Sequence, residues 1–183
     1  MLAAHHLEYA ASQHTDPLCD ETGIMVYSGS YKQVEIALVS TGSDSSAVIE
    51  YVSEAKRLGI TEILYIGECV SFSRAVPLRT VVLAEGGAPA LLHRAILAAK
   101  QYKVPVSVLP LTHSGENEPD AITLSNNITN NLYERAGEHG ISTLSILTVS
   151  ANTETGENME EHERRSRLYQ AARLVFETAA LSL

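Results

Sequence analysis

Three polar segments of this sequence follow stretches that are typical of buried strands, and they carry hydroxyl, amide and carboxyl groups. They are STGSDSS (40–46), GECVSF (67–72) and VSANTETG (149–156). In an α/β protein a ligand binds beyond the carboxyl ends of the strands, where segments far apart in the sequence can converge. The third segment is a junction of strand, polar turn and helix, yet Ala151 at its corner offers no chemical group.

The elements that would position these segments alternate between strand and helix. Apolar, β-branched runs predict strands at 34–40, 62–69, 78–85, 104–111 and 141–150. Helical spacing of apolar residues predicts helices that end at Gly59, cover 88–102 and 122–140, and begin again at about 158. The first two strands and the helix between them are expected to form a β-α-β unit with parallel strands. The alternation predicts an α/β fold, a three-layer α/β/α sandwich around a mostly parallel mixed sheet.

Length and composition are those of a soluble globular protein. The chain has 183 residues, 45% of them hydrophobic and 19% charged, which predicts a single domain, 1–183, with an irregular segment at 1–26. The net charge of −9 argues against nucleic acid or an anionic membrane as a partner. The N-terminus lacks the features of a signal peptide and no apolar run is long enough to span a bilayer, so a cytoplasmic location is expected.

The cysteines and histidines do not indicate a metal centre. Cys19 and Cys69 form neither a disulfide framework nor a zinc motif, and Cys69 is expected to be a small buried residue because it follows an apolar strand. The histidines lack metal-ligand spacing and there is no Walker-type phosphate loop, so no metal or cofactor is expected. The basic run ERRSR (163–167) is interpreted as a solvated helix face.

Several motifs occur together in an order that points to a family. They are YSGSYKQ (27–33), a strand that ends in STGS (40–43), a helix that ends in RLG (57–59), YIGECV (65–70) and ILTVSANTETGENM (146–159). In this order they resemble the nucleoside phosphorylase/nucleosidase superfamily, which includes uridine phosphorylase, hexameric-type purine nucleoside phosphorylase and methylthioadenosine nucleosidase. The resemblance covers about 27–181 and is weakest from 88 to 133, where this chain is shorter.

This resemblance implies a phosphorylase/hydrolase-like fold that needs no cofactor. It also implies a nucleoside-like small molecule as the ligand and a homo-oligomer, either a dimer or a trimer of dimers. Members of the superfamily cleave the N-glycosidic bond between ribose and base. Phosphate or water attacks the sugar, and an acidic residue helps the base to depart.

The phosphate-binding residues of the superfamily are missing from their matching positions. No arginine precedes Arg57, and Tyr65 stands where a phosphate-binding arginine would be. Glu68 matches the phosphate-binding Ser or Thr, and its carboxylate would repel phosphate. If the protein is active, hydrolysis is therefore expected in preference to phosphorolysis.

The positions for ribose and base have changed as well. The ribose-binding glutamates fall near Asn126 and Asn127, and the catalytic aspartate that assists the leaving base matches Ala151. The residues that shape the family's site are retained at Gly42, Gly67, Ser150 and Gly156.

One hypothesis is an enzyme of the same broad class with a rebuilt site. Glu68 would orient a water molecule, Asn152 would bind a base edge, and Asn126 and Asn127 would bind sugar hydroxyls. The other expected ligand contacts are Thr41, Gly42, Gly67 and Ser150. A simpler interpretation of Glu68 is exposure at a strand end, or an ion pair with Arg74 or Arg79.

A second hypothesis is a catalytically inactive relative that binds a ligand or serves as an assembly module, with Tyr65, Val70 and Phe72 filling the cleft. A neighbouring subunit could complete the site with His5 or His6, although a disordered N-terminus is the simpler explanation. Unrelated chemistry on the same fold is a third alternative.

Overall fold

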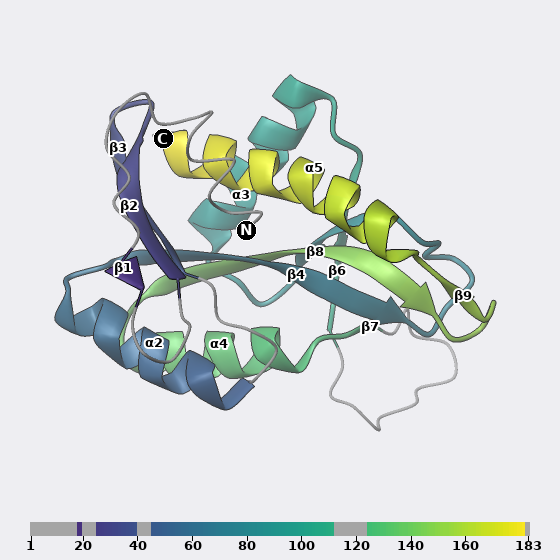
Figure 1. Cartoon of the computed structure of the whole chain (residues 1–183), viewed down its shortest axis with the longest axis horizontal. Coiled ribbons are helices and arrows are strands. Elements are labelled where there is room, and N and C mark those ends of the chain that lie inside the picture. Colours follow the sequence, from purple (N-terminus) through teal and green to yellow (C-terminus); the bar gives the residue numbers. More distant parts are fainter. Residues whose placement is uncertain (1–17, 20–24, 40–44, 112–123, 182–183) are drawn as a thin grey trace. The chain divides into compact units, whose positions relative to one another are not determined.

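A computed structural model gives the structure of residues 18–19, 25–39, 45–111 and 124–181 (Figure 1). The chain divides into two compact units, Met1–Asp44 and Ser45–Leu183. Thr41 and Gly42, two of the predicted ligand contacts, lie outside the described residues, as do His5 and His6. The single-domain organisation stays a prediction.

The first unit contains a small antiparallel sheet. Its strands are β1 (Leu18–Cys19), β2 (Met25–Tyr31) and β3 (Val34–Val39), in that order. Lys32 and Gln33 connect β2 to β3 with φ values of 48° and 71°, as a two-residue type I′ hairpin turn requires. This tight turn makes β2 the antiparallel partner of β3. The β-α-β unit predicted for 34–69 would join the two units of the chain and stays a prediction.

The second unit is built on a mixed sheet with the strand order β6-β5-β8-β4-β7. The long central strands β4 and β8 run parallel, as do β5 and β6, whereas β5 is antiparallel to β8 and β7 is antiparallel to β4. A short strand, β9, pairs with β8. The strand bounds are β4 (Glu62–Ser71), β5 (Val81–Ala84), β6 (Val106–Leu109), β7 (Leu124–Ser125), β8 (Ser142–Asn152) and β9 (Glu157–Asn158). The predicted α/β class and mostly parallel mixed sheet are confirmed.

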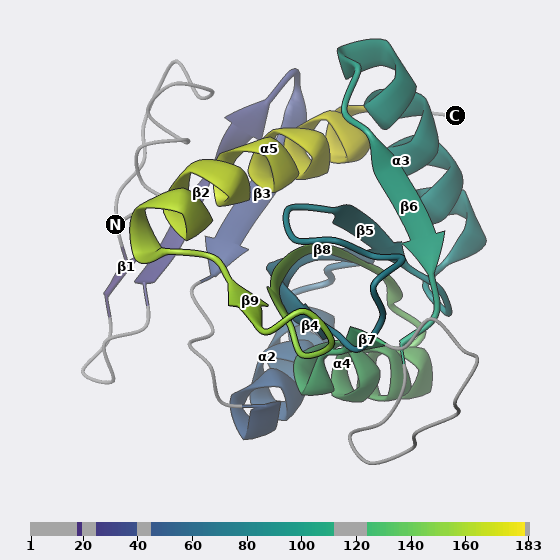
Figure 2. The ribbon, with the colours of Figure 1, turned by 90° about the vertical axis from the view of Figure 1, so that its right-hand side faces the viewer.

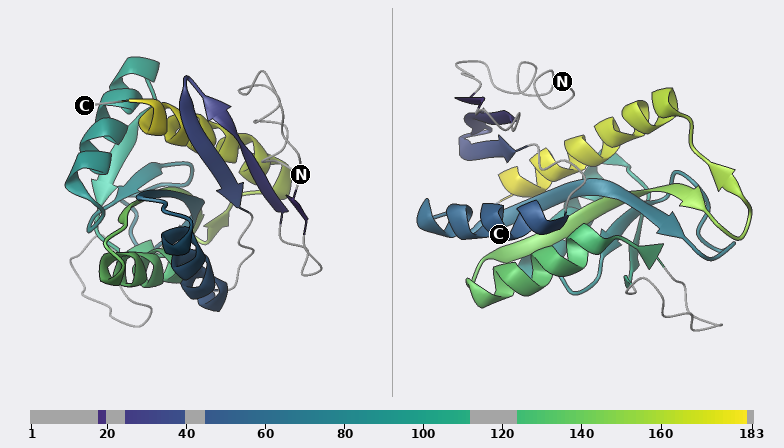
Figure 3. Two further views of the ribbon diagram at one scale, coloured as in Figure 1. Left: turned by 90° about the vertical axis from the view of Figure 1, so that its left-hand side faces the viewer. Right: turned by 60° about the horizontal axis from the view of Figure 1, so that its bottom comes forward.

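Helices pack against this sheet in two groups. The helix bounds are α2 (Ser45–Arg57), α3 (Pro89–Tyr102), α4 (Asn127–Glu138) and α5 (Glu161–Ala180). The contacts of α3 are with α5 and those of α2 are with α4, and Figures 2 and 3 show the two pairs on opposite faces of the β4–β8 pair. Each pair of helices buries its apolar side chains against the strands. This packing holds the ends of the strands in position.

Strand β8 is the centre of the core. It is buried almost without interruption because helices cover both of its faces, and this explains its continuous apolar run. Leu144 and Ile146 pack with residues of α3 and α5, whereas Leu147 and Val149 pack in a cluster with Cys69 of β4. Among the described residues, no helix combines the length and apolar character that crossing a bilayer requires.

Candidate functional site

The pairing of β4 with β8 is interrupted by a β-bulge at their C-terminal ends. Glu62–Cys69 pair in step with Ser142–Val149, but Val70 then pairs with Ala151, so Ser150 is the extra residue. The carbonyl oxygen of the buried Ser150 accepts a hydrogen bond of 2.8 Å from the backbone N–H of Met159. Bulges are common beside functional sites because they redirect the strand, and this one lies where the sequence predicted a ligand site.

Glu68 lies one residue before the start of this irregularity and forms an ion pair with α5. Its carboxylate is 3.4 Å from the guanidinium of Arg164, and the two side chains are 31% and 40% exposed. The Nε of Arg164 also donates a hydrogen bond of 3.2 Å to the carbonyl oxygen of Met159, which holds the guanidinium in place. The simpler interpretation of Glu68 was exposure at a strand end or an ion pair with Arg74 or Arg79; the side chain is partly exposed, and its ion-pair partner is Arg164 instead.

Arg74 and Arg79 pair instead with glutamates that follow β8. Arg79 binds Glu163, and its guanidinium lowers the pKa of that carboxyl group. Arg74 lies 3.6 Å from Glu154. Arginines from the β4–β5 loop and from α5 are thus neutralised by carboxylates of the chain itself at this end of the sheet.

Arg79 also has a constrained backbone. Its φ of 72° is unusual for a residue other than glycine, and its N–H donates a 2.9 Å hydrogen bond to the carbonyl oxygen of Val149. The hydroxyl of Thr80 donates a hydrogen bond to the carbonyl oxygen of Pro77 in the turn before β5, and β5 begins only at Val81. The predicted strand from Leu78 therefore begins three residues late.

Thr148 stands beside Glu68 in the register of the sheet. Neighbouring residues in a parallel pair leave the sheet on the same face, so the hydroxyl of Thr148 shares the face of the Glu68 carboxylate. Thr148 is only 2% exposed, and its hydroxyl has no hydrogen-bond partner among the described residues. A buried hydroxyl without a partner is costly, so this one is a donor available to a bound group.

Asn126, one of the two predicted sugar contacts, has its amide occupied by the protein. Its side-chain oxygen accepts from the N–H of Thr129 at 2.8 Å and caps α4. Its nitrogen donates to the carbonyl oxygen of Glu68 at 2.6 Å, and the amide also bonds the phenol of Tyr65. The neighbouring Asn127 is exposed in the first turn of α4.

Asn152, the predicted base contact, is 1% exposed and fully hydrogen-bonded. Its nitrogen donates to the carbonyl oxygens of Ser73 and Val76 at 2.9 and 3.1 Å. Its oxygen accepts from the N–H groups of Glu154 and Thr155 at 3.0 and 3.1 Å. These four bonds use the capacity of a primary amide and join the β4–β5 loop to the turn after β8.

Gly67 and Cys69 lie on the opposite face of β4 from Glu68. A Cβ atom at Gly67 would lie 2.5 Å from the phenolic oxygen of Tyr65, so the glycine makes room for that ring. Burial raises the pKa of the Cys69 thiol to about 12, and the prediction of a small buried residue at this position is confirmed. The roles of Gly67, Ser150, Asn126, Asn127 and Asn152 as ligand contacts stay predictions.

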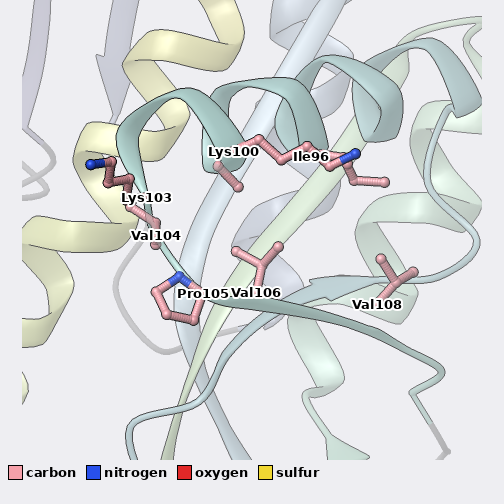
Figure 4. A pocket seen from close by; sticks show the side chains of 8 residues that line it. Ile96, Lys100, Lys103, Val104, Pro105, Val106 and Val108 are labelled. Atoms are coloured by element: carbon pink, nitrogen blue, oxygen red, sulfur yellow. The ribbon is translucent and has the colours of Figure 1, made fainter.

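A hollow of about 500 Å³ lies elsewhere, between α3 and the edge strand β6. Figure 4 shows Val104, Val106 and Val108 along its floor, and the ammonium groups of Lys100 and Lys103 pointing in opposite directions. It contains none of the predicted site residues. No group of three or more metal-ligating side chains occurs in the part of the chain that the structure describes.

The chain is similar to known proteins over most of its length. It is 25% identical to the DeoD-type purine nucleoside phosphorylase of Clostridium novyi (strain NT) over an alignment of 198 residues. This alignment covers 90% of this chain and 85% of that protein. It is 27% identical over 175 residues to the protein of that name from Bacillus subtilis (strain 168), with 79% and 75% covered. For the protein from Aliivibrio salmonicida (strain LFI1238) the identity is 24% over 194 residues, with 88% and 82% covered.

The chain is a distant relative of the nucleoside phosphorylase superfamily. This confirms the resemblance based on the sequence motifs. No protein-family model matches the chain.

Sequence reasoning missed Arg164 of this phosphorylase relative, although a signal for it was present. Arg164 is four residues before Leu168 and seven before Ala171, so it lies on the apolar stripe of α5 that faces the sheet. An arginine on that stripe must meet a carboxylate or another acceptor under the helix. The basic run was therefore only partly a solvated face.

Proposed function

We propose that the protein binds a purine-nucleoside-type ligand beyond the C-terminal ends of β4 and β8 and cleaves its N-glycosidic bond with water. The observation that carries this proposal is the half-exposed Glu68–Arg164 pair at those strand ends, in a chain whose distant relatives are named purine nucleoside phosphorylases. Charged side chains at the carboxyl edge of the sheet are the groups that a polar ligand would meet there.

In this proposal Glu68 acts on the attacking water. Its carboxylate accepts a proton as the water oxygen bonds to the sugar carbon, and the electron pair of the N-glycosidic bond passes to the base nitrogen. Ala151 has no acid to protonate the departing base, so that proton comes from solvent. Arg164 holds the Glu68 carboxylate in place through their ion pair.

The pairing of the arginines supports water over phosphate as the nucleophile. Phosphate binding needs guanidinium or ammonium groups that are free to grip its oxygens. Arg74, Arg79 and Arg164 are each engaged by a glutamate of the same chain. An incoming phosphate would have to displace a carboxylate that is already held in place.

The test is to incubate the purified protein with a panel of purine and pyrimidine nucleosides, including methylthioadenosine, with and without phosphate. Free base is measured by chromatography. The proposal expects base release from a purine nucleoside that does not depend on phosphate and is lost in Glu68→Gln. Glu154→Gln is the matched control because it removes one carboxylate from an ion pair at the same end of the sheet. Release that requires phosphate would contradict the proposed nucleophile.

A second candidate is a ligand-binding or assembly protein without turnover. It is favoured by Ala151 in place of the catalytic aspartate and by the amides of Asn126 and Asn152, which are already bonded within the protein. Binding of a nucleoside in calorimetry without base release would support this candidate over the first. The motif resemblance also supports a homo-oligomer, a dimer or a trimer of dimers, which light scattering would measure.

A further inference from the structure

We infer that Glu68 is a specificity-determining residue that keeps inorganic phosphate and similar oxyanions out of the site by occupying Arg164. This inference rests on the proposed function, because the exclusion of phosphate explains why water would be the nucleophile that attacks the sugar. The binding of an anion can nevertheless be measured without any turnover.

The first observation is the geometry of the pair. The carboxylate of Glu68 lies 3.4 Å from the guanidinium of Arg164 and forms the ion pair that a bound oxyanion would have to replace. Arg164 does not depend on Glu68 for its position, because its Nε is bonded to the carbonyl oxygen of Met159. Removing the carboxylate would therefore leave a guanidinium that is already oriented.

The second observation is a donor next to the pair. The hydroxyl of Thr148 is buried, lacks a partner among the described residues and shares the sheet face of Glu68. A guanidinium together with a hydroxyl is a donor set that suits a phosphate or sulfate oxygen. Two donors that suit an anion therefore lie on the sheet face of Glu68, and the carboxylate is paired with one of them, Arg164.

The third observation concerns the balance of charge. Arg79, the other arginine that reaches α5, is neutralised by Glu163, so this neighbouring pair adds little net charge. With Glu68 ionised, the Glu68–Arg164 pair is neutral as well. Replacing Glu68 by glutamine would give the site a net positive charge at Arg164 with little change in side-chain shape.

The experiment is a titration of wild type and variants with inorganic phosphate at low ionic strength, followed by calorimetry and by ³¹P NMR. We expect Glu68→Gln to bind phosphate about tenfold more tightly than wild type, the factor that one charge-assisted hydrogen bond supplies. The double variant Glu68→Gln/Arg164→Gln should return to the wild-type affinity. Glu154→Gln, the matched control, frees the highly exposed Arg74 and should bind phosphate no better than wild type.

Several results would overturn the inference. These are an unchanged affinity in folded Glu68→Gln, a gain that survives Arg164→Gln, and an equal gain in Glu154→Gln. Wild type serves as a test that needs no variant at Glu68, because a dissociation constant below about 1 mM that is weakened by Arg164→Gln would show that Glu68 does not exclude phosphate. Circular dichroism checks that each variant is folded.

Failure of the proposed function can be told apart from failure of this inference. If no nucleoside is bound or cleaved but Glu68→Gln gains a phosphate site through Arg164, the proposed function fails and the inference holds. If base is released with water but Glu68→Gln gains no phosphate affinity, the proposed function holds and Glu68 is not the residue that excludes the anion.

Discussion

The amide side chains and the charged side chains at the C-terminal ends of β4 and β8 differ in what satisfies them. Asn126 and Asn152 are bonded to main-chain groups, which cannot leave without unfolding a loop or a helix end. Glu68 and Arg164 are bonded to each other across a half-exposed contact. A side chain whose partner is the backbone is part of the scaffold, whereas a pair of solvated side chains can exchange its partner for a ligand.

The contrast is sharpest between the successive residues Glu68 and Cys69, and it predicts an unreactive thiol. In a Cys19→Ser variant, Cys69 should react with a disulfide reagent at pH 8 roughly a thousandfold more slowly in the native protein than in urea. With its pKa raised to about 12, only roughly one thiol in ten thousand is ionised at pH 8. Equal rates in the native and unfolded protein would contradict the burial of this face of β4.

The same pKa shift gives a dependence of stability on pH. Because the folded-state pKa of Cys69 is raised from an ordinary value of 9.0 to about 12, the folded protein retains a proton that the unfolded chain releases in this range. The contribution to stability is complete below pH 9 and is lost as the pH rises toward 12. Between pH 9 and pH 12 the free energy of unfolding should therefore fall less steeply with pH in Cys69→Ala than in wild type.

Asn152→Ala should be the most destabilising of the substitutions at the strand ends. It removes four hydrogen bonds and takes a partner from the carbonyl oxygen of the buried Val76, so a loss of about 3 kcal/mol in the free energy of unfolding is expected. Urea denaturation measures it, with the exposed Asn158→Ala as control. A loss below about 1 kcal/mol would mean that the amide is free enough to serve a ligand.

Asn126→Ala should destabilise the protein by about 2 kcal/mol, because it removes the cap of α4 and the bond to the carbonyl oxygen of Glu68. Asn127→Ala, at the next and exposed position, should change stability by no more than about 0.5 kcal/mol. Asn126→Ser would keep the cap and recover part of the loss. Equal effects at Asn126 and Asn127 would contradict the structural role given to the cap and to the bond with Glu68.

Glu68→Gln should have a small effect on stability. An ion pair between half-exposed side chains contributes about 0 to 1 kcal/mol, and glutamine still fits the space. Urea denaturation should therefore place this variant close to wild type and to Glu154→Gln. A loss as large as that of Asn152→Ala would show that Glu68 belongs to the scaffold after all.

Much of the fold could be predicted because the signals are local. The apolar run from Ile141 predicted the central strand β8, and the spacing from Ala88 to Tyr102 predicted α3 almost to the residue, with Pro89 in its first turn. The hairpin of β2 and β3 depends on the left-handed backbone of Lys32 and Gln33, which their residue types do not indicate. The first residue of β5 was predicted too early because the positive φ of Arg79 cannot be inferred from an arginine in the sequence.

The sequence predicted that the candidate segments lie at neighbouring strand ends, but it did not predict the partners of their side chains. The segment types placed Glu68 and Asn152 at neighbouring strand ends, and the register of β4 and β8 agrees with that. Whether an amide is available depends on loop carbonyls such as those of Ser73 and Val76, more than seventy positions away. The role of Arg164 was missed because its charge is typical of a solvent-exposed residue, although its helical spacing from Leu168 and Ala171 places it on the side of α5 that faces the sheet.

The most direct test of the account is the rate of base release from a purine nucleoside by wild-type protein, measured at increasing phosphate concentration. The account predicts release at a rate that phosphate does not increase, because the arginines at the strand ends are held by Glu68, Glu154 and Glu163. Release that rises in proportion to phosphate, with ribose 1-phosphate as the product, would contradict it. That result would mean that the ion pairs open to admit the anion.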